Sequence, residues 1–358
     1  MAAEFFRSRG DEVLYLGSDL VHIGKHVRTA KEGMRLIRTL VYRRNISIRR
    51  LLSHYCFSRD ALRIMKEEPE ADLLWLSVPH NCNAAIGPRY KKLYPNARMI
   101  VDITDLWPET MPLPGTGRWP FTLWSGIRDR ALKTADFVFL ECGLFERVLG
   151  KRLEGIPHAV MPWLKKDRPW NSAFEDPSYH LPESEVRLCY LGSVNNIIDI
   201  DRILSVVRAF RKQKKVSVEL IASGERKEEF LKGLEDAGAS VTDHGESYDE
   251  AEKQAMMDRC HFGINIMKPS VVIGMSMKSI DYLAGGIPMI TNIGADTAEL
   301  VQREHCGILI GEDGAFDARA ALSEPFDRGS IRRLFETRFS SSCFAGYAEA
   351  ARPYIKEL

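Results

Sequence analysis

The stretch VVIGMSMKSIDYLAGGIPMITN, residues 271–292, decides the fold of the second half of the chain. We interpret it as a loop, a helix, a tight turn and a buried strand. Ser276 is a good N-cap, because its hydroxyl can accept a hydrogen bond from a free amide of the first helical turn. Gly285 and Gly286 end the helix, where a left-handed residue is favoured. Residues 287–290 then form a short buried strand.

The predicted helix has an apolar side and a polar side at about 100° per residue. The apolar side carries Met277, Ile280, Leu283 and Ala284, and the other carries Lys278, Asp281 and Tyr282. The loop before it contains Gly274 and Met275, and a glycine loop that runs into a helix N-terminus is suited to an anion. Lys278 adds a positive charge, and Asp281, one turn further, would hold ribose hydroxyls. The alternative is an ordinary surface helix with a Lys–Asp pair.

Length and composition predict a two-domain cytosolic protein. The chain has 358 residues, 45% of them apolar, which suffices for two hydrophobic cores. The seven cysteines are scattered without a CxxC pair, which indicates reduced thiols and neither a disulfide framework nor a zinc site. No apolar run reaches the ~18–20 residues of a membrane helix, and the N-terminus lacks the apolar core of a signal peptide.

Strands alternate with helices in both halves of the chain. In the first half we predict helices at 2–8 and 121–133, and strands at 12–16, 71–77, 98–104, 136–141 and 158–163. Residues 165–185 are polar with three prolines and form a linker. Beyond it lie strands at 186–191, 216–222, near Val241, and at 261–267, 287–290 and 307–310, with helices at 199–212, 226–237, 248–259, 295–304, 329–337 and 342–357.

This alternation predicts an α/β fold of two tandem, doubly wound Rossmann-like domains that face each other across a cleft. We expect a first domain at 1–164, the linker at 165–185 and a second domain at 186–340. A C-terminal helix at 341–358 would pack back on the first domain.

In such sheets, ligands bind beyond the carboxyl ends of the strands. In the second domain these ends are Gly192–Ser193, Ser223–Gly224 and the loop before Ser276. In the first domain they include His80 and the stretch DITDLWPE, residues 102–109. These residues are therefore the candidates for a site.

Four motifs, in this order, resemble glycosyltransferases of the GT-B fold, family 4, group 1, of the bacterial polysaccharide type. They are DITDLWPE at 102–109, YLGS at 190–193, ELIASG at 219–224 and MKSIDYLAGGIPMI at 277–290. The last is similar to that family's Lys-x-x-Glu-Tyr-Leu-Ala-x-Gly element, with Asp281 where Glu is usual. The resemblance extends over nearly the whole chain.

The resemblance implies a metal-independent hexosyltransferase that retains the anomeric configuration and has no cofactor. Its substrate would be a UDP- or GDP-linked sugar, held by Gly192, Ser193, Ser223, Gly224, Gly274, Met275, Ser276, Lys278 and Asp281. The catalytic residues would be Asp105 and Lys278, and the acceptor side would be His80, Asp105 and Glu109. The acceptor would be a lipid-linked or oligosaccharide hydroxyl in polysaccharide biosynthesis.

The chain departs from the family's pattern at three places. Ile273 stands where the first of two spaced glutamates is usual, and Asn195 and Asn196 stand where a basic pair often follows the first loop. Lys278 and the loop amides would then have to neutralise more of the phosphate charge. The N-terminal sequence looks like the family's first helix and second strand, so either the chain starts late or the first domain lacks the strand that usually comes first.

The stretch from Lys25 to Arg63 carries eleven lysines and arginines against two acids, interleaved with apolar residues. Such a basic amphipathic stretch favours contact with anionic lipid headgroups, and the alternative is a solvated helical face. We expect a cytoplasmic protein, peripheral at the inner face of the membrane. The run lacks interleaved stacking aromatics, so no nucleic acid is expected.

The sequence has one further candidate motif and allows two other functions. Asp199 and Asp201 match an Asp-x-Asp metal motif, but they stand at a predicted helix start, which acidic residues favour. A sugar-nucleotide epimerase can use the same architecture. A non-catalytic nucleotide-binding partner of a glycosyltransferase would account for Ile273 and the missing basic pair.

Overall fold

The computed structural model describes residues 1–20, 33–42, 47–111, 119–176, 181–311 and 313–355. The chain divides into two compact units. The first comprises Met1–Glu141, Phe145–Met161 and Phe344–Leu358, and the second comprises Cys142–Leu144 and Pro162–Cys343. The segment 165–185, predicted as a linker, therefore groups with the second unit.

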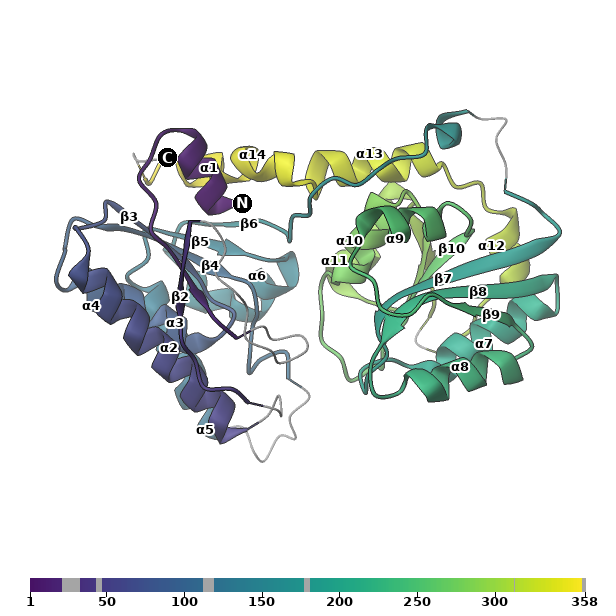
Figure 1. Ribbon diagram of the computed structural model, residues 1–358, viewed down its shortest axis with the longest axis horizontal. Helices are drawn as coiled ribbons and strands as arrows, with labels where there is room; N and C mark the ends of the chain where they lie inside the picture. Colours follow the sequence, from purple (N-terminus) through teal and green to yellow (C-terminus); the bar gives the residue numbers. More distant parts are fainter. Residues whose placement is uncertain (21–32, 43–46, 112–118, 177–180, 312, 356–358) are drawn as a thin grey trace. The chain divides into compact units, whose positions relative to one another are not determined.

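A four-stranded parallel sheet forms the centre of the first unit (Figure 1). Its strands lie in the order β3 (Leu73–Ser77), β4 (Arg98–Ile103), β5 (Phe137–Leu140), β6 (His158–Val160). The helices are α2 (Ile48–Glu67), α3 (Asn81–Ala84), α4 (Ile86–Lys91), α5 (Trp119–Leu132) and α6 (Gly143–Leu149), which begins in the segment grouped with the second unit. All residues of β5 and most of β4 are buried, so the core follows these two strands.

The two ends of the first unit add smaller elements. After α1 (Ala2–Ser8), β1 (Tyr15–Ser18) and β2 (Met34–Ile37) pair in parallel as a separate two-stranded sheet. We did not predict β2, because its four residues lie inside the cation-rich stretch. The segment with α14 (Phe344–Ala348) belongs to this unit: the Phe344 ring contacts Phe5 and Trp75.

A six-stranded parallel sheet forms the second unit. Its order is β12 (Gly307–Leu309), β11 (Met289–Thr291), β10 (Phe262–Asn265), β7 (Glu185–Ser193), β8 (Lys215–Ser223), β9 (Ser240–Asp243). From β7 the strands follow chain order in one direction, through β8 to β9, and from β10 they follow it in the other, through β11 to β12. The strand order therefore reverses between β7 and β10. That reversal is the topological switch point, where open α/β sheets bind ligands.

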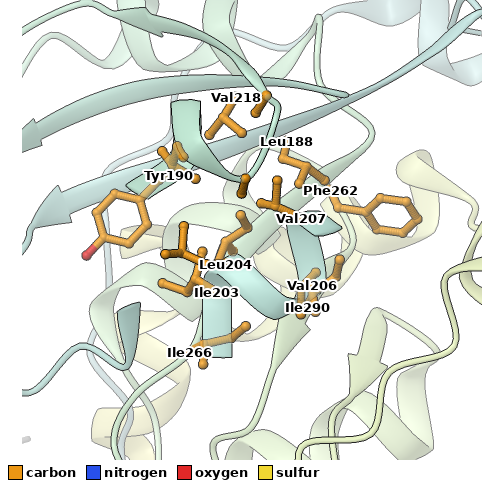
Figure 2. Close-up of a cluster of buried hydrophobic side chains, with 14 of the residues drawn as sticks. Leu188, Tyr190, Ile203, Leu204, Val206, Val207, Val218, Phe262, Ile266 and Ile290 are labelled. Carbon is orange, nitrogen blue, oxygen red and sulfur yellow. The ribbon is translucent and has the colours of Figure 1, made fainter. Parts of the chain in front are cut away.

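Helices cover both faces of this sheet (Figure 1). On one side lie α7 (Ile200–Arg211), α8 (Lys227–Asp236) and α12 (Ala318–Ser323), and on the other α9 (Glu250–Met257), α10 (Met277–Ala284) and α11 (Ala295–Glu304). The long helix α13 (Arg328–Arg338) packs on α10. Asp199 caps α7 by accepting from the Arg202 amide at 3.1 Å. The apolar side of α7 joins the hydrophobic cluster over β7, β8 and β10 (Figure 2).

The predicted parallel α/β fold is confirmed, but the predicted faces of the helix now labelled α10 are partly wrong. Met277 is 42% exposed and Tyr282 is buried. The reason is Gly263 on β10, where a side chain would lie 2.5 Å from the Tyr282 ring. Without that side chain, the aromatic ring packs directly on the strand, and nearly the whole circumference of α10 is buried. Among the described helices, none is long and apolar enough to cross a membrane.

Candidate functional site

The first turn of α10 begins as the sequence predicts. Ser276 accepts a hydrogen bond from the Ser279 amide at 3.1 Å, and Gly286, past the helix end, has φ +59°. Asn265, at the end of β10, places its amide group under this turn and donates to the hydroxyls of Ser276 and Ser279 at 2.8 and 2.9 Å. Its own Oδ1 is buried and has no hydrogen-bond partner within the described structure, which is unusual for a fully buried amide.

Lys278 extends from this turn to the end of β7. Its Nζ donates to the Tyr190 hydroxyl at 2.5 Å and lies 3.9 Å from the centre of the Tyr190 ring. Gly192 has φ +94°, and a Cβ there would lie 3.4 Å from Cε of Lys278, so the lysine stem packs along the glycine backbone. Burial lowers the pKa of Lys278 to about 7, and the charge of Asp281 acts in the opposite direction.

The ends of β7 and β8 meet beside this lysine. The Val194 amide donates to the Ser223 carbonyl at 2.7 Å. Gly224 has φ +111°, and a Cβ there would lie 2.5 Å from the Val194 carbonyl oxygen, so only glycine fits. The structure thus brings Gly192, Ser193, Ser223, Gly224 and Lys278 to one edge of the sheet. Gly192 and Ser193 are exposed there.

The loop with Gly274 and Met275 is fixed from the other side by α11. Both the amide and the hydroxyl of Thr297 donate to the Gly274 carbonyl, at 2.9 and 2.7 Å. A Cβ at Gly274 would lie 2.6 Å from Oδ2 of Asp296. Gly274, Met275 and Ser276 are all buried. The loop that precedes α10 is therefore held in one conformation.

Asp281, predicted to hold ribose, is engaged within the second unit. Lys165 and Arg168 contact its Oδ1 at 2.5 and 2.6 Å, and Arg168 also pairs with Glu250 at 2.5 Å. Both cations use the same oxygen, so Oδ2 is the atom that a ribose hydroxyl would need. The ribose contact stays a prediction.

The departures from the family pattern have local explanations. Ile273 packs, partly buried, against the hydrophobic cluster of the second unit. Oδ1 of Asn195 accepts from the Ile197 amide at 3.1 Å, which stabilises the turn after β7. Sequence reasoning missed Arg226, whose amide donates to the Val194 carbonyl at 3.1 Å and whose guanidinium pairs with Glu229 at 2.5 Å. The sequence could have indicated Arg226 as a site residue, because it stands two residues after Gly224, at the end of a predicted strand.

In the first unit, Asp105 follows β4. Burial raises the pKa of Asp105 to about 6, while the charge of Arg50 and a hydrogen bond from the Leu106 amide act in the opposite direction. The Arg50 guanidinium lies 4.5 Å from the centre of the Trp107 ring, in the loop that carries Asp105. An aspartate with this pKa is mainly ionised at pH 7 and can still accept a proton.

His80 and Glu109, the other acceptor-side candidates, differ sharply. The His80 ring stacks on His54, with centres 3.9 Å apart and planes at 6°. Burial, together with the charges of His54 and Arg50, lowers the pKa of His80 well below its usual range, so its imidazole is neutral. Glu109 instead holds the buried Arg128 through two hydrogen bonds of 2.6 and 3.0 Å.

Glu109 also accepts from Arg152 at 2.6 Å. Burial of Glu109 works against ionisation, but hydrogen bonds and charge from Arg128, with Arg152, keep the pKa of Glu109 below its usual range. Both carboxylate oxygens are committed to arginines. Glu109 therefore has the geometry of a structural ion pair.

No protein-family model and no curated protein matches the chain. Solved structures do. Sucrose-phosphate synthase from Thermosynechococcus elongatus superposes with a TM-score of 0.71 and 16% identity, over 99% of this chain and 91% of that one. HepE of Anabaena in complex with UDP gives 0.61 and 11%, over 89% and 86%. The apo lipopolysaccharide outer core galactosyltransferase WaaB gives 0.61 and 12%, over 89% and 84%.

At these identities the likeness shows the fold, which is GT-B. The N-terminal domain of a trehalose-6-phosphate phosphatase from Candida albicans shares it as well, with a TM-score of 0.64 and 9% identity, over 90% of this chain and 84% of that one. The activity has to be argued from the residues.

Proposed function

We propose that this protein is a glycosyltransferase that moves a sugar from a nucleotide sugar to a hydroxyl of a lipid-linked or oligosaccharide acceptor. One observation carries the proposal: Lys278 lies in the first turn of α10, against Gly192 at the end of β7, at the switch point of the second sheet. Within the described residues it forms no ion pair. Similar structures solved in complex with UDP, or with UDP and glucose, support a nucleotide-sugar ligand.

The donor's leaving group is a diphosphate, so catalysis must stabilise the charge that develops on it. The Lys278 ammonium and the positive end of the α10 dipole provide that stabilisation, together with the backbone around Ser193 and Gly274. Metal independence and retention of the anomeric configuration are both part of the proposal through the family resemblance.

The first unit holds the acceptor. Asp105 accepts or orients the proton of the attacking hydroxyl, because no arginine of the described chain clamps it as Arg128 clamps Glu109. The neutral His80 imidazole is the second candidate. Positioned bases of this kind contribute about 10²–10⁴-fold in rate.

The protein would lie at the inner face of the membrane, and the structure describes only part of the predicted contact stretch 25–63. Residues 25–32 and 43–46, including Arg43 and Arg44, lie outside the described residues. Ile37 is buried and Arg35 pairs with Glu68 at 2.5 Å. Arg50 packs on Trp107. Among the described residues of the stretch, the exposed ones include Arg38, Leu40 and Val41 and one side of α2.

That side of α2 carries apolar residues three and four positions apart. Ile48 is 77% exposed, and Leu51, Leu52 and Tyr55 are exposed as well. The exposed arginines on the same helix include Arg49 and Arg63. Apolar side chains flanked by cations are the pattern of an interfacial helix on anionic lipid.

A second candidate is a non-catalytic nucleotide-binding partner protein. Two observations favour it: Ile273 packs on the core where the family has a carboxylate, and Asp281 is paired with Lys165 and Arg168. Such a protein would bind the nucleotide and never release it from a sugar.

The test uses calorimetry and a transfer assay. UDP, GDP and ADP are titrated into the protein, and the radiolabelled sugar of the nucleotide that binds is then offered with a lipid extract. We expect one nucleotide to bind and its sugar to enter the lipid fraction. Binding without transfer to any lipid or oligosaccharide supports the partner protein. Absence of binding for all three nucleotides contradicts both candidates.

A further inference from the structure

Lys278 is surrounded by neutral groups on the side of β7. The Tyr190 hydroxyl donates to the Ser193 carbonyl at 3.0 Å, so its oxygen accepts from Lys278. The Tyr190 ring is 0% exposed and belongs to the core cluster, and Figure 2 shows its hydroxyl directed away from that cluster. Tyr190 therefore connects the core to the lysine through a single rigid side chain.

The carboxylate on the same helix forms no ion pair with Lys278. Asp281, one turn away on α10, acts on Lys278 only through its charge, because its Oδ1 is bound by Lys165 and Arg168, and Arg168 also pairs with Glu250. Tyr282, one turn further along α10 than Lys278, is buried, and its hydroxyl donates to the Ile264 carbonyl at 2.9 Å. Over the described part of the chain, no acid lies within ion-pair distance of Lys278.

We propose that the phosphate of the ligand supplies the missing counterion of Lys278, that binding takes up a proton at this lysine, and that Tyr190 is the positioning residue that holds it there. This inference rests on the proposed function, because it concerns the same site. It adds a coupling between pH and ligand affinity that the fold alone does not imply.

The direction of the coupling follows from the pKa values. Desolvation lowers the pKa of Lys278 to about 7 in the free protein. A phosphate beside the amine favours the charged form and raises that pKa. Below pH 7 the lysine is already charged and no proton is taken up. Above pH 7 uptake rises toward one proton, and affinity falls by up to tenfold per pH unit.

Tyr190 changes the pKa of Lys278 in a predictable direction. Its hydroxyl oxygen and its ring face both stabilise a positive charge more than a neutral amine. Removal of the hydroxyl in Tyr190→Phe therefore lowers the pKa of Lys278 further, so that the midpoint of proton uptake moves to lower pH. A residue with only a packing role would leave that midpoint unchanged, because the ring is retained.

The experiment is calorimetry with UDP and with pyrophosphate between pH 6.5 and 9, in PIPES, HEPES and Tris, whose ionisation enthalpies differ. The slope of apparent enthalpy against buffer enthalpy gives the protons taken up. We expect uptake to rise with pH in the parent and to vanish in Lys278→Arg, since a guanidinium stays charged. Tyr190→Phe should bind more weakly at pH 7.5, with an earlier midpoint, and the exposed Tyr248→Phe should match the parent.

The outcomes separate the two proposals. If none of UDP, GDP and ADP binds, and pyrophosphate does not bind either, the proposed function fails and this inference fails with it. If the parent binds with no proton uptake across the range, the lysine is charged throughout and only the inference is overturned. If uptake occurs but Tyr190→Phe keeps the parent's midpoint and affinity while folding normally, Tyr190 has no positioning role.

Discussion

Each unit places a cation over an aromatic ring near the carboxyl ends of its parallel strands, and the two cations differ in their surroundings. In the second unit Nζ of Lys278 lies 3.9 Å from the Tyr190 ring centre, and no carboxylate pairs with it among the described residues. In the first unit Arg50 lies 4.5 Å from the Trp107 ring centre and influences the charge of Asp105. Arg50 also donates to the His54 ring at 3.4 Å.

The difference indicates the chemistry that each unit suits. A lysine without a counterion is completed by an anionic ligand and can gain or lose a proton at neutral pH. An arginine stays charged, so beside Asp105 it favours an ionised carboxylate that can accept a proton from a hydroxyl. The second unit is thus suited to a diphosphate and the first to an alcohol.

The largest expected effect is the loss of sugar transfer on replacement of Asp105. It tests whether the first unit holds the carboxylate that accepts the proton. Asp105→Asn should reduce sugar transfer by about 10²–10⁴-fold while nucleotide affinity and the melting temperature stay unchanged. In the parent, the transfer rate should rise with pH through about 6, because burial raises the pKa of Asp105 to that value. Full transfer by Asp105→Asn would move the role to His80.

The next effect distinguishes Glu109 from Asp105, although both stand in the same motif. Glu109→Ala removes the bidentate partner of the buried Arg128 and leaves it Asp129 at 2.8 Å, so the cost should stay below the roughly 3–5 kcal/mol of a buried cation with no acid left. Urea unfolding should show this loss of stability. In the surviving folded protein, transfer per molecule should be retained; a selective loss of transfer at parental stability would make Glu109 an acceptor-side residue after all.

Lys278→Ala tests whether the lysine of the second unit binds the diphosphate. A charge-assisted contact to phosphate contributes about 1.5–3 kcal/mol, so nucleoside diphosphate affinity should fall by roughly 10- to 150-fold at pH 7. The half-buried Lys278 forms no ion pair among the described residues, so its removal leaves no charge unpaired and the melting temperature should hold. Lys232→Gln, an exposed lysine on α8, is the matched control and should bind as the parent does. Equal affinity for both variants would make Lys278 a structural lysine.

The smallest effect per residue concerns the membrane. Each cation near an anionic surface contributes about 1 kcal/mol, so Arg49→Gln with Arg63→Gln should weaken flotation on anionic vesicles by roughly 30-fold at low salt. Lys212→Gln with Lys232→Gln, which removes the same charge from the second unit, should have no effect. Equal flotation of the parent on neutral vesicles would reject an electrostatic contribution.

Local signals in the sequence predicted much of the fold. The cap at Ser276, the stop at Gly285–Gly286 and the alternation of strands and helices all depend on neighbouring residues, and the structure confirms them. The failures concern residues that the fold brings together from distant positions. Tyr282 was assigned to the polar side of its helix because nothing near it in sequence shows that Gly263 leaves room for its ring.

For the candidate site, too, the sequence predicted the local features but not the contacts between distant residues. Strand ends and glycines pointed to Gly192, Ser193, Ser223 and Gly224 without knowledge of the strand order. The contact of Lys278 with Tyr190 spans 88 residues and exists because β7 and β10 are neighbours at the switch point. The pairing of Asp281 with Lys165 and Arg168 spans more than 110, and it involves a segment whose polar composition suggested a linker.

The most direct test of the diphosphate site is a spectrum of the lysine side chains. The protein, labelled with ¹⁵N at lysine Nζ, is titrated with the nucleoside diphosphate that binds, and the Lys278 signal is identified by its loss in Lys278→Arg. Our account predicts that this signal shifts furthest on binding and sharpens, as a phosphate slows exchange of its protons. A Lys278 signal that stays in place while other lysines move would contradict it.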